Sequence, residues 1–122
     1  MNSELQNKLY EKYPALFVQR DWPMMQTCMC WGIEVGDGWY EILDKMCAAL
    51  SKLEHPPQFS QIKEKFGTLR VYTDNCSDAS DAIIAEAEAM SGVTCEICGQ
   101  MGKINNGPWY TVRCEGCAKK GE

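Results

Sequence analysis

Two cysteine pairs near the carboxyl end constrain this chain more than any other feature. Cys95 and Cys98 stand in "TCEICGQ", and Cys114 and Cys117 stand in "RCEGCAK", with fifteen residues between the two pairs. A C-x2-C-x15-20-C-x2-C pattern is typical of a zinc site, because two intervening residues let one tight turn aim two sulfurs at a single ion. The four cysteines therefore predict one bound Zn2+.

The predicted zinc ion has a structural role. A closed four-thiolate site leaves no coordination position for water, so we expect the metal to hold a small segment together rather than to catalyse. Iron or a redox dithiol is the alternative. We expect Gly99 and Gly116 to give the two turns their backbone freedom. The intervening "KINNGPWYTVR" predicts two short strands joined at residues 105–107, which completes a zinc ribbon.

The metal interpretation requires reduced thiols. Glu4 and Lys8 interrupt the amino terminus before any apolar run appears, so we expect no secretory signal. No apolar stretch approaches the ~20 residues that cross a bilayer. We therefore expect a cytoplasmic protein, where paired CxxC motifs favour metal over disulfides, with a small secreted disulfide domain as the alternative.

The spacing of Cys28, Cys30, Cys47 and Cys76 predicts no second metal site, and Cys47 is expected to be a core residue.

Hydrophobic periodicity predicts an α+β fold with two parts, a body over residues 1–92 and the zinc ribbon packed on it over residues 93–122. Helices are expected over residues 3–13, 38–53 and 78–91. Alternating apolar residues predict a central β-hairpin over residues 58–73.

The ends and faces of these elements can also be predicted. Ser3 and Gln6 suggest a capping box for the first helix, Asp37 a cap for the second, and Gly92 a left-handed end for the third. The expected apolar faces are Ile62 with Phe66 and Leu69 with Val71 in the hairpin, and Ala79, Ile83, Ala87 and Met90 in the third helix. Residues 14–36 show no sustained period and are expected to be irregular, with a short strand through "CMCWGIEV".

The sequence does not indicate an enzyme. His55, the single histidine, precedes two prolines at a helix end and is expected to be solvated. We find no HExxH metal motif and no glycine-rich phosphate loop. Asp37, Glu34 and Glu41 around "GDGW" leave a carboxylate enzyme open, although acidic residues at helix starts are common for electrostatic reasons.

Charge argues against a global attraction to nucleic acid. The formal net charge is -5, and four thiolates around one zinc add about -2. We therefore do not expect nucleic acid as a direct ligand, nor an anionic membrane surface. The exception is a basic cluster in the hairpin, Lys63, Lys65 and Arg70. It could contact a phosphate or an acidic partner, or it could be a solvated face that guards an edge strand.

Large apolar residues crowd the irregular segment and give a candidate partner-binding site. They are Trp22, Met24, Met25, Met29 and Trp31. Exposed on a loop, such side chains would form an interaction patch. The alternative is that the loop wraps the core and buries them.

Several stretches resemble a known family. "GDGWYEIL", "QIKEKFGTLRVYTD" and an Ala/Glu helix leading into "TCEICG" and "GPWYTVRCEGC" look like small phage- and prophage-encoded proteins with a carboxy-terminal zinc ribbon. The similar region covers residues 36–117, and residues 1–35 fall outside it. The resemblance carries over no active-site residue, because the family as a whole has no assigned activity.

The resemblance implies a phage context, and with it a host cytoplasm as the site of action. Small acidic phage accessory proteins often bind a host or defence protein stoichiometrically, as anti-CRISPR and other anti-defence inhibitors do. We therefore expect a non-enzymatic binding protein that modulates or inhibits such a partner. The alternatives are a zinc-ribbon nucleic-acid regulator that uses Lys63, Lys65, Arg70, Lys103 and Arg113 locally, and, third, a small enzyme. The sequence leaves a homodimer open.

Overall fold

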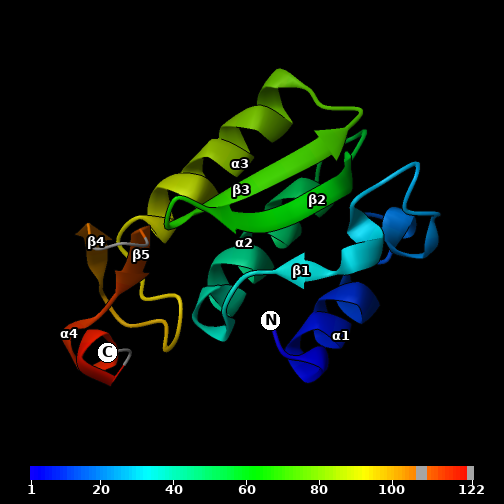
Figure 1. The fold of residues 1–122 in the computed structure, drawn as a ribbon. Helices are drawn as coiled ribbons and strands as arrows, with labels where there is room; N and C mark the ends of the chain where they lie inside the picture. The colour runs from blue at the N-terminus through cyan, green and yellow to red at the C-terminus, as the bar shows by residue number, and fades with distance from the viewer. Residues whose placement is uncertain (107–109, 121–122) are drawn as a thin grey trace.

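The computed structural model of the chain describes residues 1–106 and 110–120 and has an α+β fold, as predicted (Figure 1). The helices are α1 (Ser3–Lys12), α2 (Tyr40–Ser51), α3 (Asp78–Ser91) and α4 (Glu115–Lys120). The strands are β1 (Ile33–Glu34), β2 (Gln58–Lys65), β3 (Thr68–Asp74), β4 (Lys103–Asn106) and β5 (Tyr110–Arg113). Short 3-10 helices are η1 (Val18–Asp21), η2 (Met29–Trp31) and η3 (Asp37–Trp39). The three predicted long helices, the hairpin and the short strand near residue 33 are confirmed.

The strands form two separate sheets. In the first, β1 pairs parallel with β2, and β2 pairs antiparallel with β3, so the sheet is mixed. Strands β4 and β5 form the second, antiparallel sheet, as the ribbon pattern predicts. Gly107, in the predicted connection between them, lies outside the described residues.

One core joins the hairpin, the helices and the irregular segment. The inward side chains of the hairpin, Phe59, Ile62 and Leu69, are fully buried and pack in the same cluster as residues of α1, α2 and α3. The ring of Phe17 lies 5.0 Å from Tyr10 and 4.9 Å from Phe59, centroid to centroid, which anchors the irregular segment on the sheet.

The first helix begins differently from the prediction. Asn2 is its cap, because Oδ1 of Asn2 accepts a hydrogen bond from the backbone N–H of Leu5 (2.9 Å). The predicted capping box of Ser3 with Gln6 is wrong. The side chain of Gln6 instead accepts a hydrogen bond from the backbone N–H of Ile33 (2.8 Å), and so ties α1 to β1.

The predicted roles of Asp37 and Gly92 are also wrong. Asp37 makes no cap for the second helix, and its carboxylate accepts hydrogen bonds from the backbone N–H and the amide of Asn2 (2.7 and 2.9 Å). Gly92 has right-handed backbone angles, φ -67° and ψ -14°. For Asp37, a contact with a distant segment replaces the local capping signal, whereas the N–H of Gly92 continues the helical pattern by donating to the carbonyl of Ala89 (3.1 Å).

The buried face of α3 is rotated from the predicted one. Its buried residues are Ser80, Ile84, Ala87 and Ser91, whereas Ala79 and Met90 are exposed. The two serines can be buried because their hydroxyls are hydrogen-bonded. Ser80 Oγ donates to the carbonyl of Ser77 (2.9 Å), and Ser91 Oγ accepts a hydrogen bond from the backbone N–H of Leu69 in β3 (2.9 Å). A count of apolar residues alone cannot find such positions.

Phe66 is exposed, not buried beside Ile62 as predicted. It lies in the β2–β3 turn with φ 55°, a left-handed conformation, and is followed by Gly67 at φ 89°. The last residue pair between β2 and β3 is Lys65 with Thr68, so the strand alternation of inward and outward side chains ends there. Phe66 therefore belongs to the turn and not to the strand.

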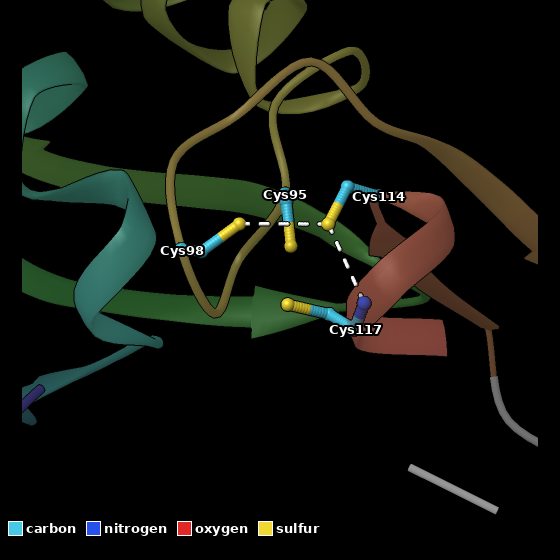
Figure 2. Close-up of side chains that lie close together, drawn as sticks. All are labelled: Cys95, Cys98, Cys114 and Cys117. Carbon is cyan, nitrogen blue, oxygen red and sulfur yellow. Dashed lines mark hydrogen bonds between the residues drawn. The ribbon is translucent and has the colours of Figure 1, made fainter. Parts of the chain in front are cut away.

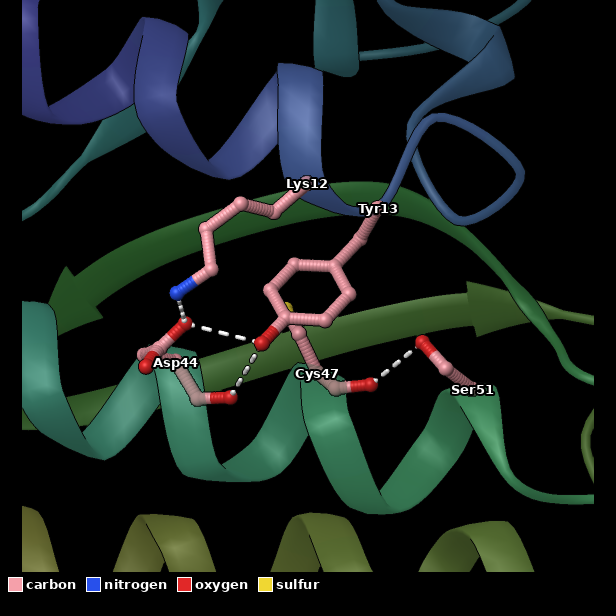
Figure 3. Close-up of polar contacts among 5 residues, drawn as sticks. All are labelled: Lys12, Tyr13, Asp44, Cys47 and Ser51. Atoms are coloured by element: carbon pink, nitrogen blue, oxygen red, sulfur yellow. Dashed lines mark hydrogen bonds and ion pairs between the residues drawn. The ribbon is translucent and has the colours of Figure 1, made fainter.

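A polar cluster joins α1 to α2 (Figure 3). The carboxylate of Asp44 accepts hydrogen bonds from Lys12 Nζ (2.7 Å) and from the hydroxyl of Tyr13 (2.9 Å). Burial alone would raise the pKa of Asp44, but the bonds from these two donors outweigh it and lower that pKa. Beside it, Cys47 is buried and its desolvation raises the pKa of the thiol, so Cys47 is an inert core residue as predicted.

None of the helices within residues 1–106 and 110–120 has the length and apolar character that crossing a bilayer requires.

Candidate metal centre

The fold brings the sulfurs of Cys95, Cys98, Cys114 and Cys117 together, as predicted from their spacing (Figure 2). All four Sγ atoms lie within 4.8 Å of one another. A tetrahedral zinc ion with Zn–S bonds of 2.3 Å separates its ligands by about 3.8 Å. The cluster therefore needs only a small contraction to enclose one ion, and its all-sulfur donor set fits zinc.

The first pair is shaped by a tight turn. The backbone N–H of Cys95 donates to the carbonyl of Gln100 (2.7 Å), and the N–H of Gly99 donates to the carbonyl of Cys95 (2.9 Å). Gly99 has φ 80°, a left-handed conformation, which confirms the predicted need for a glycine there.

The second pair is built on a different element from the one predicted. Cys114 follows β5, and Cys117 lies in the first turn of α4, where its backbone N–H donates to Sγ of Cys114 (3.4 Å). Gly116 lies within this helix and not in a left-handed turn, so its predicted role is wrong. The helix itself sets the angle between the two sulfurs.

The thiols hold their protons unequally. Burial raises the pKa of Cys95, but backbone hydrogen bonds from Cys114, Cys98 and Ile97 outweigh it and lower that pKa to about 6. Hydrogen bonds with the sulfurs of Cys114 and Cys98 raise the pKa of Cys117 to about 12. The four sulfurs therefore share protons, and metal binding must release those that remain.

The tight turn that carries Cys95 and Cys98, residues 95–100, is called the metal turn. It packs against the "GDGW" segment of the body. The backbone N–H of Gly38 donates to the carbonyl of Glu96 (2.8 Å), and that of Gly36 donates to Oε2 of Glu96 (2.8 Å). The indole N–H of Trp39 donates to the carbonyl of Thr94 (2.9 Å). A Cβ on Gly38 would lie 2.2 Å from the carbonyl oxygen of Cys95, so only glycine allows this approach.

The hairpin turn makes a second contact with the ribbon. A Cβ on Gly67 would lie 3.0 Å from the backbone of Tyr110, and the rings of Phe66 and Tyr110 meet edge to face at 6.4 Å. The "GDGW" and "KFGT" stretches thus both support the metal site. Sequence reasoning missed this role, although the paired glycines and a buried tryptophan that needs a hydrogen-bond partner were visible signals.

The predicted partner-binding residues do not all share one environment. Trp22, Met24, Met25 and Trp31 are exposed, Met25 at 93%. Met29 is fully buried and contributes to the core, so its assignment to a partner surface is wrong. Its position in η2, facing the sheet, explains the difference.

The remaining candidates are dispersed. Lys65 and Arg70 are exposed and Lys63 is half-buried, all in the hairpin. Cys28 and Cys76 are exposed, and within the described residues the one cluster of metal-binding side chains is the four-cysteine cluster. His55 is solvent-exposed, as predicted.

Comparison of the chain with protein-family models, with curated proteins and with solved structures finds no match.

Proposed function

We propose that this chain is a stoichiometric binding protein, of the phage accessory type, that modulates or inhibits a host or defence protein. The metal is a structural Zn2+ held by the four cysteines, and the chain performs no catalysis. The phage context rests on the resemblance of residues 36–117, and the binding role rests on the exposed apolar side chains of residues 22–31.

The observation that carries the proposal is an exposed apolar loop. We call Trp22, Met24, Met25 and Trp31 the Trp/Met loop. Tryptophan and methionine are enriched at protein interfaces, where a few anchors supply most of the binding energy. Large apolar side chains gathered on one exposed segment mark an interaction site more often than chance exposure does.

The loop is held in place beneath these side chains. Thr27 donates a hydrogen bond to Gln19 (2.7 Å), and Gln19 in turn donates to Asp74 of β3 (2.6 Å). The backbone N–H of Cys28 donates to the carbonyl of Ser60 in β2 (3.1 Å), and Met29 fills the core. A partner would therefore meet a surface that is ordered in advance, which lowers the entropic cost of binding.

Trp22→Ala and Met25→Ala are expected to weaken capture of the partner by about 30-fold each, since truncating an interface anchor costs ~2 kcal/mol. Zinc content and the thermal midpoint should stay near the wild-type values, because Met25 is almost fully exposed and Trp22, which is 39% exposed, is not one of the side chains packed on the core cluster. The measurement is affinity capture from host lysate with identified masses, followed by titration of the captured protein after purification.

Met101→Ala is the matched control, because Met101 is also 87% exposed but lies in the ribbon. It should leave capture unchanged. Equal capture by wild type, Trp22→Ala and Met25→Ala would contradict the proposed surface. Unfolding of both variants would instead assign these side chains to the core.

A further inference from the structure

The outer side of the β2–β3 hairpin carries the cations of the predicted basic cluster. The register pairs Lys63 with Arg70 and Gln61 with Tyr72, on the side opposite to the buried Ile62–Val71 pair. In the view of Figure 1, α2 passes behind β2, and α3 runs alongside β3. We call Lys63, Lys65, Phe66, Arg70 and Tyr72, with Tyr110 of β5, the hairpin face.

The cations of the hairpin face have no ionic partners. The salt bridges among the described residues join Lys12 to Asp44, Arg20 to Asp21 and His55 to Glu54, and none includes Lys63, Lys65 or Arg70. The Lys63 ammonium instead lies 5.9 Å from the ring centre of Tyr72, and that of Lys65 lies 5.6 Å from Phe66. Three charges thus remain available to an anion, in a chain whose net charge is -5.

Three aromatic rings stand among these cations. Phe66, Tyr72 and Tyr110 are all exposed, Phe66 at 64%. Phe66 holds φ 55°, which is costly for a bulky residue and is found where the surroundings or function require it. Its backbone thus presents an aromatic ring at the tip of the hairpin, next to Tyr110.

We propose that the hairpin face binds single-stranded nucleic acid, with the cations on the phosphates and the rings under the bases. Single-strand sites combine a cationic track with aromatic side chains on which unpaired bases stack. A duplex would meet the cations only, since its bases are already stacked. An acidic peptide would likewise leave the three rings without flat partners.

The net charge of -5 sets the field of the whole chain, which repels nucleic acid at a distance. The three unpaired cations of the hairpin face act at short range, where they can outweigh that field. Neutralising three phosphates of a single strand gives a salt slope of about -2, so affinity should fall about 20-fold between 50 and 200 mM salt. Binding at this site is therefore expected to depend strongly on salt. Glu34, in register beside Lys63, opposes phosphate binding locally.

The test uses the zinc-loaded full chain and fluorescence anisotropy with a labelled 12-nucleotide oligo-dT, an oligo-U and a duplex of equal length. We expect micromolar binding of the single strands at 50 mM salt and weaker binding of the duplex. Phe66→Ala and Tyr72→Ala should each weaken binding about 10-fold, since stacking contributes ~1–3 kcal/mol per base. Phe66→Trp should restore it.

Charge variants give effects of opposite sign. Lys63→Glu with Arg70→Glu should abolish binding, and Glu34→Gln should strengthen it. Lys45→Glu, an exposed lysine on α2, is the matched control and should change binding far less. Trp22→Ala should have no effect, so failure here and failure of the proposed protein-binding role are distinguishable.

Several outcomes would overturn the proposal. No binding of either single strand at 50 mM salt is one. Binding that survives the loss of Phe66 and Tyr72, in variants whose thermal midpoint equals that of the wild type, is another. If poly-glutamate competes with oligo-dT as strongly as unlabelled oligo-dT does, the face is instead a site for an acidic protein.

Discussion

Cys114→Ser is expected to reduce bound zinc from one ion per chain to a small fraction of that and to unfold the ribbon. Structural zinc in small domains supplies on the order of 10 kcal/mol of apparent binding free energy, which a three-thiolate site largely loses. The effect should extend into the body, because Gly38 and Trp39 bond to the metal turn. The measurements are metal analysis after gel filtration and thermal unfolding followed by circular dichroism.

Cys28→Ser is the matched control, because Cys28 is an exposed cysteine outside the metal cluster. It should retain full zinc content and the wild-type midpoint. Wild-type zinc content and an unchanged midpoint in Cys114→Ser would contradict a structural role for the metal.

Gly38→Ala is expected to destabilise the protein by at least ~2 kcal/mol and to lower its zinc affinity. The added Cβ would lie 2.2 Å from the carbonyl oxygen of Cys95 and 2.6 Å from the backbone nitrogen of Gly99. Both are backbone atoms, so no side chain can rotate away. The metal turn must therefore shift from its seat on the body. Chemical unfolding and competition with a zinc chelator measure the two effects.

Gly116→Ala makes the same change inside the metal segment, but no atom lies within 4 Å of the added Cβ. Because Gly116 is in a helix, this control should be neutral or slightly stabilising. If Gly38→Ala behaves like Gly116→Ala, the close packing of the metal turn on the body is not important for stability.

The metal cluster could be predicted from sequence because its signal is local. Two residues inside each cysteine pair limit how far apart the sulfurs can lie, and the strands between the pairs bring them together. The long helices and the hairpin were likewise predictable from periodic apolar residues. The geometry of the second cysteine pair was not predictable, because a CxxC pair fits the start of a helix as well as a turn. Cys117 in α4 is an example.

What the sequence could not give depends on contacts between distant segments. Gln6 carries a capping-box signal, yet its side chain bonds to Ile33, 27 residues away. Met29 stands among exposed neighbours of the same chemical type, and only the placement of η2 against the sheet makes it a core residue. The positive charges of the hairpin were visible in the sequence as Lys63, Lys65 and Arg70. The exposure of the Phe66 ring was not predictable, because Phe66 lies in a turn and its periodicity assigned it to the strand.

Zinc K-edge X-ray absorption of the purified, reduced wild-type protein, with metal content measured on the same sample, tests the four-cysteine centre most directly. We expect one zinc ion per chain, surrounded by four sulfur atoms at about 2.3 Å. Oxygen or nitrogen atoms in place of any of these sulfurs, or native protein without zinc and with Cys95 and Cys98 joined in a disulfide, would contradict the account.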